Sequence, residues 1–299
     1  MANPRIVFVH RRTELQELLD RHATRGQAEF FLRTRGRNLQ DVQDRHDKLT
    51  AALAAMRASI PAEWRQADVE RADLSRFLLA DDDIVAVVGQ DGLVANVAKY
   101  LNGQPVLGID PEPGTNPGVL VNHSPAQAAA LLAAADSAGL PCQDLTTVTA
   151  TLDDGQQLSA LNEVFVGHAS HQSARYQLTA PRADGKPASE RQSSSGLIVS
   201  TGTGATGWCA SIALERGGRT LPAPTDPRLA WFVREAWPSP ITGASLTEGA
   251  LLAGESLRIT VASDQLVVFG DGMEDDRLTA SWGQEITVEL GRTPLRLVA

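Results

Sequence analysis

Hydrophobic and polar positions change in a regular way along the first third of the chain. Ile84–Val88 is a run of five apolar residues, four of them β-branched, and it follows the acidic run Asp81–Asp83. Such a run predicts a buried strand. A helical face follows it, formed by Leu93, Val94, Val97, Ala98 and Leu101. Gly89–Gly92 is therefore predicted to form a strand-to-helix turn, where open α/β sheets bind their ligands.

The same alternation of strands and helices occurs on both sides of this turn. Strands are predicted at Ile6–Val9, Trp64–Val69 and Val106–Ile109. Helices are predicted from a capping box at Thr13 to Leu19, over Val42–Met56, and over Ala126–Ala138. The arginine-rich stretch Arg21–Arg37 has no clear period, and we interpret it as a solvated loop rather than a phosphate-binding arm. Alternating strands and helices predict a mostly parallel sheet.

After Pro141 the pattern becomes one of strands. They are predicted at Thr146–Leu152, Gln157–Val166, Arg175–Thr179, Leu197–Val199, Leu257–Val261, Leu266–Phe269, Ile286–Leu290 and Leu295–Val298. Asp154-Gly155 and Asp184-Gly185 are turn signals, and at most one helix is expected, near Thr206–Leu214. The predicted fold is an α/β N-terminal domain with a mostly parallel sheet (residues 1–122), and a β-rich, sandwich-like C-terminal domain (residues 123–299).

Composition narrows the class of protein. The 299 residues are 42% hydrophobic and 21% charged, with a net charge of −9. This balance is typical of a globular protein and argues against a large nucleic-acid or membrane surface. Cys142 and Cys209 form no CxxC motif, no apolar run reaches the length of a membrane span, and the residues before Ile6 are too few for a signal peptide. We expect a cytoplasmic protein.

Two clusters besides the Gly89–Gly92 turn could carry chemistry. Asn162-Glu163 lies inside an apolar stretch, where buried polar groups need partners. Neighbouring strand residues point to opposite faces, so at most one of the two lines a site unless a bulge intervenes, and a strand end with one solvated acid is the alternative. Ser200–Gly207 combines hydroxyls and three glycines after a strand. Glycines let backbone N–H groups approach a phosphate, and a following helix adds a favourable dipole.

Other signals are weaker. The loop has no Gly-Lys-Ser/Thr, so it is not a P-loop. Gly202, Gly204 and Gly207 have the bare G-x-G-x-x-G spacing, but the β-rich context excludes a Rossmann fingerprint. His168 and His171 lack a third ligand nearby, so we predict no metal site built from side chains. Asp271-Gly272 is a turn that could contact a ligand.

Together the three clusters resemble the NAD kinase family, and most closely its mitochondrial-type branch and the bacterial relatives of that branch. The family's marks are a Gly-Gly-Asp-Gly turn, an Asn-Glu pair and a Thr/Ser/Gly-rich loop. They occur here as Gly89–Gly92, Asn162-Glu163 and Gly196–Gly207, and the likeness extends from Ile6 to Val298. The resemblance implies an α/β domain followed by a β-rich domain. It also implies phosphoryl transfer from ATP or polyphosphate to the 2′-hydroxyl of the adenosine ribose of NAD, giving NADP, with Mg²⁺ or another divalent metal.

The resemblance also implies roles for individual residues. Asp91 would accept or orient the hydroxyl proton, and Gly89, Gln90 and Gly92 would border the donor phosphates. Asn162 and Glu163 would bind the dinucleotide. The loop residues Thr201, Gly202, Thr203, Gly204 and Thr206 would hold nucleotide, with Trp208 at the family's aromatic position and Asp271 near the ligand. Members are commonly dimers or tetramers, so a homo-oligomer is expected by analogy.

Three positions depart from the family's pattern. Gln90 replaces the second glycine, Leu93 replaces a threonine, and Ser195 stands where most relatives have an acid. If position 90 needs a positive φ, a side chain there costs about 1–2 kcal/mol. Two alternatives therefore stay open: a kinase of the same superfamily acting on a lipid or sugar hydroxyl, and an NAD-binding regulator with weak catalysis. The acidic net charge counts against a lipid acceptor.

Overall fold

The computed structural model describes residues 4–115, 118–134, 139–182 and 186–299. The chain forms two compact units. The first contains Met1–Gln143 together with Arg296–Ala299, and the second contains Asp144–Leu295. The sequence pattern predicts the domain boundary at residue 122, earlier in the chain than this division. Each unit is described by itself.

The first unit is built on a six-stranded sheet of order β2-β1-β3-β4-β18-β5. Its strands are β1 (Arg5–His10), β2 (Arg65–Glu70), β3 (Asp83–Val88), β4 (Pro105–Ile109), β5 (Cys142–Leu145) and β18 (Leu295–Val298). β1 pairs in parallel with β2 and β3, and β4 pairs in parallel with β3 and β18. The predicted, mostly parallel sheet is confirmed.

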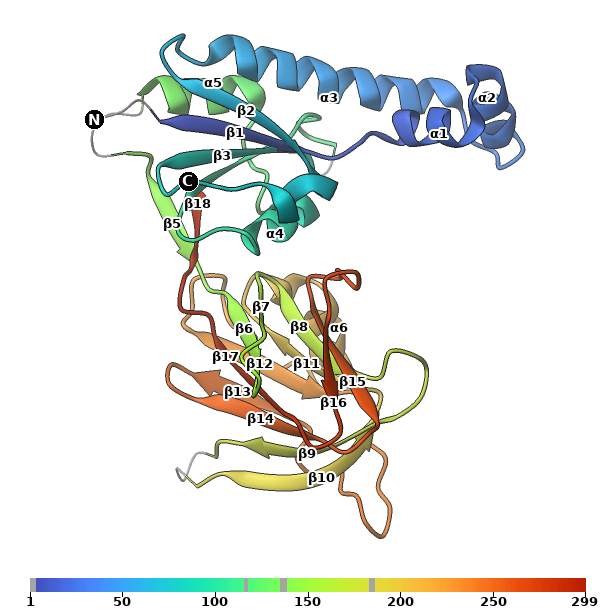
Figure 1. Ribbon diagram of the computed structural model, residues 1–299, viewed down its shortest axis with the longest axis vertical. Helices are drawn as coiled ribbons and strands as arrows, with labels where there is room; N and C mark the ends of the chain where they lie inside the picture. Colours follow the sequence, from blue (N-terminus) through green and yellow to red (C-terminus); the bar gives the residue numbers. More distant parts are fainter. Residues whose placement is uncertain (1–3, 116–117, 135–138, 183–185) are drawn as a thin grey trace. The chain divides into compact units, whose positions relative to one another are not determined.

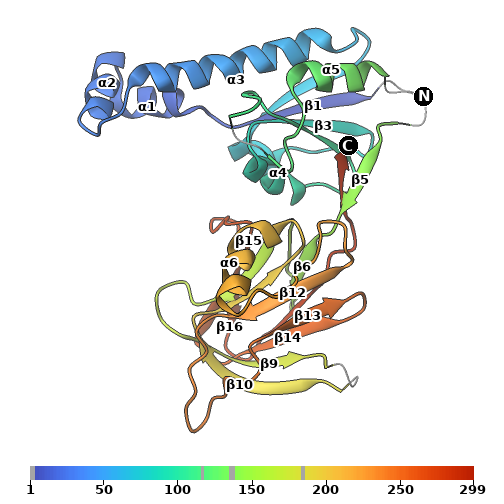
Figure 2. The same ribbon diagram turned by 180° about the vertical axis from the view of Figure 1, so that it is seen from behind.

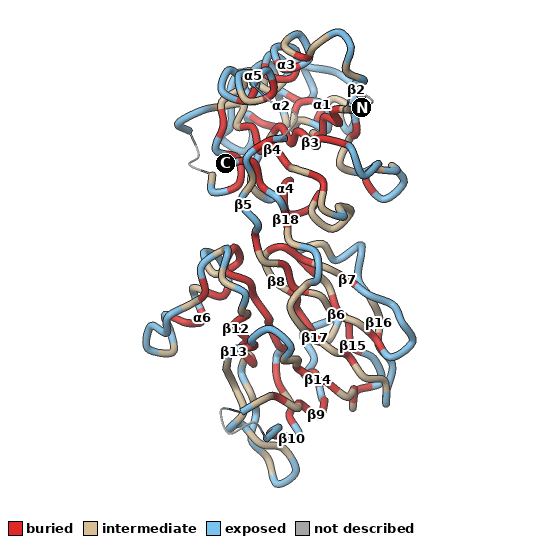
Figure 3. The backbone as a smooth tube through the Cα atoms, turned by 90° about the vertical axis from the view of Figure 1, so that its left-hand side faces the viewer, coloured by how far each residue is buried: buried red, intermediate tan, exposed pale blue. Residues whose placement is uncertain are grey.

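Helices cover both faces of this sheet. Figures 1 and 2 show α3 (Leu39–Ser59) and α5 (Pro125–Ala134) over one face and α4 (Asp91–Ala98) under the other. A core of Phe8, Met56, Leu107 and Leu132 fills the space beneath α3 and α5. Every residue of β3 is buried, as Figure 3 shows for this strand and for most of β4. Burial on both faces explains why β3 reads as one continuous apolar run.

The loop predicted over Arg21–Arg37 is wrong for most of its length. The chain forms α1 (Glu14–His22) and α2 (Arg25–Arg33) there. Thr24 caps α2 by accepting a hydrogen bond from the Gln27 N–H, and Ala28 and Leu32 are buried four residues apart. They join Leu15, Leu18, Leu39 and Val42 in a small separate core. The period of α2 is hard to recognise in the sequence because only this narrow face, Ala28 and Leu32, is buried.

The second unit is a sandwich of two antiparallel sheets, which confirms the predicted β-rich architecture. One sheet has the order β10-β9-β14-β17-β6-β7, and the other β13-β12-β11-β8-β15-β16. The strands are β6 (Val148–Leu152), β7 (Gln157–Ala160), β8 (Glu163–Gly167), β9 (Ala174–Ala180), β10 (Ala188–Ser194), β11 (Leu197–Ser200), β12 (Arg228–Val233), β13 (Glu248–Leu252), β14 (Ser256–Val261), β15 (Gln265–Gly270), β16 (Leu278–Ser281) and β17 (Glu285–Leu290).

Side chains from both sheets form one core, which includes Tyr176, Trp231, Ile259 and Val288. The helix α6 (Trp208–Glu215) follows a short 3₁₀ turn (Gly204–Thr206) and packs Cys209 and Ile212 on Ile198 and Phe232. The predicted helix near Thr206–Leu214 therefore exists. The turn signal at Asp184-Gly185 and the end of the helix predicted over Ala126–Ala138 lie outside the described residues.

One strand prediction needs correction. Gln157–Val166 is not a continuous strand, because β7 ends at Ala160 and β8 begins at Glu163. The backbone N–H groups at the break are bound by a side chain instead of a neighbouring strand, as described below. In the part of the chain that the structure describes, no helix is long and apolar enough to cross a membrane.

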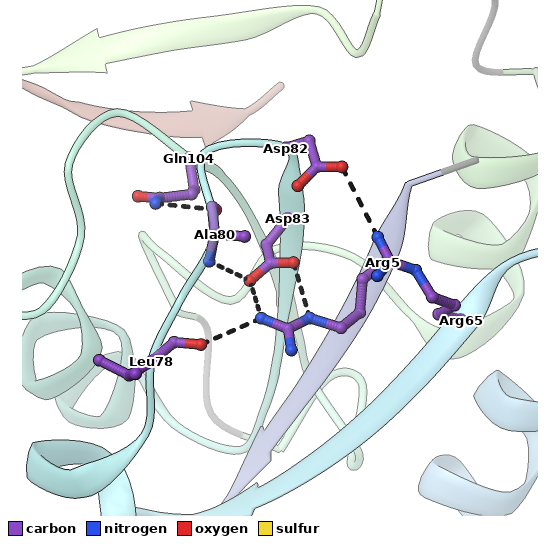
Figure 4. A network of polar contacts seen from close by, with 7 residues as sticks. All are labelled: Arg5, Arg65, Leu78, Ala80, Asp82, Asp83 and Gln104. Carbon is purple, nitrogen blue, oxygen red and sulfur yellow. Dashed lines mark hydrogen bonds and ion pairs between the residues drawn. The ribbon is translucent and has the colours of Figure 1, made fainter. Parts of the chain in front are cut away.

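A buried ion pair joins the starts of β1 and β3, which lie level in the parallel register (Figure 4). The Arg5 guanidinium donates to both carboxylate oxygens of Asp83, at 2.8 and 2.6 Å. The Asp83 side chain is fully buried, and Oδ2 also accepts from the Ala80 N–H at 2.7 Å. Arg5 further donates to the carbonyl of Leu78. The pair fixes the alignment of the strand that leads to the Asp91 turn.

Replacing Arg5 with Met should lower the free energy of unfolding by about 3–5 kcal/mol, because the Asp83 charge is then left buried without a cation. Urea denaturation followed by circular dichroism measures this change. The matched control is Arg65→Met, which breaks the exposed 3.7 Å pair with Asp82 in the same network (Figure 4). Exposed pairs contribute about 0–1 kcal/mol, so equal effects of the two variants would contradict the assignment.

Candidate functional site

One candidate site, in the first unit, is the turn between β3 and α4. α4 begins at Asp91, and Gln90 occupies the N-cap position with φ −110° and ψ 162°. These angles are ordinary extended backbone, which any L-residue adopts. The positive φ considered for position 90 is therefore absent, and Gln90 introduces no backbone strain into the turn.

The Asp91 carboxylate holds a neighbouring segment of the first unit. Its Oδ2 accepts from the Val119 N–H at 2.8 Å. Its Oδ1 accepts from the N–H groups of Leu120 and Val121, at 3.0 and 2.9 Å. Leu120 and Val121 are buried, so the segment is firmly packed where Asp91 binds it. Three successive backbone donors thus fix the position of the carboxylate.

The two glycines of the turn differ in their surroundings. A Cβ on Gly89 would lie 3.2 Å from Cδ2 of Leu93, so a side chain there would crowd the first turn of α4. A Cβ on Gly92 would meet no atom of the described residues within 4 Å, and Gly92 itself is exposed. The space beside Gly92 in the first turn of α4 is therefore open among the described residues, and the partial positive charge of a helix N-terminus favours an anion nearby.

A second candidate site, in the second unit, is the break between β7 and β8. The Asp271 carboxylate accepts from the N–H groups of Leu161 (3.0 Å), Asn162 (2.7 Å) and Glu163 (3.3 Å). The Asp271 N–H donates in return to the Glu163 carbonyl at 3.1 Å. Asp271 adopts φ +53°, an uncommon angle for a residue with a side chain. These bonds explain why the strand is interrupted at Asn162.

Thr201 holds the same break from its carbonyl side. Its hydroxyl donates to the Leu161 carbonyl at 2.5 Å, and its N–H donates to the Asn162 carbonyl at 2.9 Å. The hydroxyl also accepts from the N–H groups of Thr203 and Gly204. The turn over Leu161–Glu163 is thus held by Asp271 through its N–H groups and by Thr201 through its carbonyls.

The glycines of the Ser200–Gly207 loop permit close packing. A Cβ on Gly202 would lie 1.9 Å from the Ala223 carbonyl oxygen, and one on Gly204 would lie 2.3 Å from that of Asn162. The Gly204 N–H is already bound to the Thr201 hydroxyl. Near Asn162 the loop therefore needs glycine to approach neighbouring backbone, a reason that the sequence pattern does not reveal. Thr206 is exposed at the far end of the loop, and its hydroxyl donates to the Thr203 carbonyl.

Glu163 has a strongly perturbed carboxyl group. Burial, followed by the nearby charge of Asp271, raises the pKa of Glu163 to about 7. Near neutral pH the group exists in both protonation states, so it can donate as well as accept a hydrogen bond. Titratable groups with such shifts are common in functional sites.

Trp208 begins α6 and lies between two other side chains. Its ring stacks on Phe165, with centroids 5.8 Å apart and planes 15° apart. The Arg234 guanidinium lies 4.8 Å from the Trp208 ring centroid. The indole is still 38% exposed, so it offers a rigid aromatic surface to a planar ligand.

The described residues contain no group of three His, Cys, Asp or Glu side chains that could hold a metal ion. The His168 ring Nδ1 is engaged locally, with the N–H and the hydroxyl of Ser170. Glu163 and Asp271 are neighbouring carboxyl groups in the second unit's site, but they do not form such a three-membered group with another described side chain.

The structure brings together three motifs that are far apart in the sequence: Asn162-Glu163, the Thr201 loop and Asp271. The Gly89–Gly92 turn belongs to the other compact unit. Sequence reasoning missed the Val119–Val121 segment that Asp91 binds, and also Arg234. Neither could be found from a motif, because one contributes backbone N–H groups and the other is a single arginine beyond a strand end.

One curated protein shares clear sequence similarity with this chain. It is a protein of Methylococcus capsulatus named NAD kinase, and the two are 32% identical over 207 residues. The matched region covers 64% of this chain and 67% of the relative. No family model matches the chain.

Replacing Glu163 with Gln should stabilise the protein in a pH-dependent way. The folded pKa of about 7 lies above the ordinary value of 4.5, so ionisation of Glu163 costs stability as the pH rises through this interval. The variant should match the wild type below pH 4.5 and gain up to about 3 kcal/mol above pH 7. Urea denaturation across this pH range measures the difference. The exposed Glu274→Gln is the control, and a pH-independent gain for Glu163→Gln would contradict the raised pKa.

Replacing Asp271 with Asn should destabilise the Leu161–Glu163 turn. The amide keeps one acceptor oxygen, so at least one buried N–H loses its partner, at a cost of about 1–3 kcal/mol. Hydrogen exchange should show faster exchange of the amides of residues 161–163. Asp264→Asn, on an exposed turn of the same unit, serves as the control. Unchanged exchange in Asp271→Asn would show that its carboxylate does not hold the turn.

Proposed function

Because this chain belongs to the NAD kinase family, it is a phosphotransferase of the NAD kinase kind, and we propose that it transfers a phosphoryl group from ATP or polyphosphate to the 2′-hydroxyl of the adenosine ribose of NAD. The product is NADP. Phosphoryl transfer depends on positioning and charge stabilisation more than on covalent chemistry by the protein. The proposal therefore concerns the groups that hold the dinucleotide, the hydroxyl and the donor.

The observation that carries the proposal is the turn held by both Asp271 and Thr201. Its backbone N–H and carbonyl groups are bound within the protein, as described above. The Asn162 and Glu163 side chains are half-buried next to the ordered loop that leads to Trp208. We assign dinucleotide binding to this group of residues: Asn162, Glu163, Thr201, Gly202, Thr203, Gly204, Thr206, Trp208 and Asp271.

Glu163 has the chemistry to bind a ribose or a base. A carboxyl group with a pKa of about 7 can accept from a ribose hydroxyl when ionised and donate to a ring nitrogen or carbonyl when protonated. Trp208 adds a partly exposed indole ring, which is held by Phe165 and Arg234. Stacking and hydrogen bonding together suit a planar base attached to a ribose.

Asp91 is the group that we propose accepts the hydroxyl proton. A carboxylate has about four lone-pair positions, and three are used by the Val119, Leu120 and Val121 N–H groups. Because Oδ1 accepts two of these bonds and Oδ2 only one, Oδ2 keeps a position for a substrate hydroxyl. The clamped carboxylate is pre-organised, and a positioned base lowers the cost of removing the proton as the new P–O bond forms.

The donor would bind at the open end of α4, beside Gly89, Gln90 and Gly92. A divalent cation such as Mg²⁺ would arrive with the donor, held mainly by the donor's own phosphate oxygens, since Mg²⁺ is commonly bound through substrate phosphates. When bound, the cation would neutralise part of the phosphate charge. We also propose that the protein is cytoplasmic, on the basis of its cysteine usage. We propose that it forms a homo-oligomer by analogy with other family members.

Asp91→Asn should lower the rate of NADP formation by about 100-fold or more, because a positioned general base contributes about 10²–10⁴. Purified protein is incubated with NAD, Mg²⁺ and either ATP or polyphosphate, and NADP is measured enzymatically. Calorimetry should show NAD binding within about twofold of the wild type, since the change removes a proton acceptor. Asp81→Asn, on an exposed loop of the same unit, is the control.

The outcomes separate the candidate functions. NAD binding by the wild type without NADP formation from either donor would favour a regulator, and transfer to a lipid or sugar alone would favour the other superfamily reaction. NADP formation by Asp91→Asn at the full rate would remove Asp91 from the chemistry. A fall in NAD binding that matches the fall in rate would mean that Asp91 acts only by holding Val119–Val121.

A further inference from the structure

Arg11 directly follows the carboxyl end of β1, the strand next to the one that leads to Asp91. β1 and β3 pair in parallel, and the last paired residues are Val9 and Val87. Arg11 comes two residues after Val9, and Gly89 comes two residues after Val87, so both lie just beyond the ends of their strands. Because parallel strands end at the same edge of a sheet, about 4.8 Å apart, an arginine side chain at this position can reach the turn on the neighbouring strand.

Arg11 is available to a ligand, whereas several other cations of the first unit are engaged. Arg12 forms an ion pair with Asp20, Arg37 with Glu14, and Lys48 with Glu112. Arg71, which follows β2 at the same edge, donates to the Asn96 side chain at 2.7 Å. Arg11 is exposed and its side chain forms no hydrogen bond or ion pair with any residue that the structure describes.

The Asp91 turn needs a positive charge that its own residues do not supply. Gly89–Gly92 contains one carboxylate and no cation, in a chain with a net charge of −9. A phosphoryl donor brings several negative charges, and phosphoryl transfer requires their neutralisation. The open N-terminal end of α4 offers partial positive charge, and the open space at Gly92 leaves room for a phosphate.

We propose that the Arg11 guanidinium binds a phosphate of the phosphoryl donor, at the edge of the sheet beside the Asp91 turn. This inference rests on the proposed function and assigns to it a residue outside the family's motifs. The planar guanidinium can donate two parallel hydrogen bonds to one phosphate, which a lysine ammonium does not reproduce. The donor would then lie between Arg11 on one side and the start of α4 on the other.

The test is binding of donor phosphate, measured separately from catalysis. Calorimetry with inorganic tripolyphosphate and Mg²⁺, and with a non-hydrolysable ATP analogue and Mg²⁺, should show about 10-fold or weaker affinity for Arg11→Ala than for the wild type, as expected for loss of charged hydrogen bonds. Arg11→Lys should be intermediate. Affinity for NAD should stay within about twofold, because the change is confined to the donor side.

Arg21→Ala is the matched control, since it removes the same charge from an exposed position in the last turn of α1. Its donor affinity should equal that of the wild type, and in the coupled assay only Arg11→Ala should raise the KM for the donor. Equal donor affinity of Arg11→Ala and Arg21→Ala would overturn the inference, as would an equal weakening of both, which indicates a general charge effect.

The inference and the proposed function fail in different ways. If the wild type forms NADP but Arg11→Ala binds both donors normally, the inference is wrong and the function stands. If the wild type forms no NADP but Arg11→Ala binds tripolyphosphate more weakly than Arg21→Ala does, the function is wrong and Arg11 remains a phosphate ligand.

Discussion

Two aspartates, one in each compact unit, each bind three consecutive backbone N–H groups of another segment. Asp91 holds Val119–Val121, and Asp271 holds Leu161–Glu163. A charged acceptor satisfies donors that would otherwise have to join a sheet or face water. Each clamp therefore allows the chain to leave regular structure inside a packed unit, and in each unit the residues concerned border a candidate site.

The clamps determine what the neighbouring residues do. In the second unit, Asp271 and Thr201 together fix the backbone of the Leu161–Glu163 turn, so the Asn162 and Glu163 side chains remain for a ligand. The nearby glycines allow this close arrangement, since a Cβ on Gly202 or Gly204 would collide with neighbouring carbonyls. Glu163 is half-buried, and this partial burial together with the nearby charge of Asp271 raises its pKa to about 7. A rigid turn with a carboxyl group poised between two protonation states suits recognition of a polar ligand.

Electrostatics set the remaining requirement. The chain carries an excess of acidic residues, and the two candidate sites contain three of them, Asp91, Glu163 and Asp271. A phosphorylated donor therefore needs local positive charge: the start of α4, a cation that arrives with the donor, and the exposed arginine at the adjacent strand end. The parallel sheet supplies this arrangement, because the strands β1 and β3 end at the same edge.

Much of this protein could be derived from the order of its residues. The sequence predicts four features: the apolar run of β3, the capping box at Thr13, the parallel sheet and the change to β structure. Most of these can be recognised because burial imposes a period on the side chains. The sequence also placed Asp91, Asn162-Glu163 and the Thr201 loop in recognisable motifs.

Only the tertiary structure decided how those motifs are used. The sequence pattern does not predict α2, because only one narrow face of this helix is buried. The break in the strand at Asn162 depends on the carboxylate of Asp271, which lies 109 residues further along the chain. The ordinary φ of Gln90 and the exposure of Arg11 beside the Asp91 turn are likewise known only from the folded structure. A sequence determines local preference and periodicity, whereas hydrogen bonds between distant segments exist only once the chain has packed.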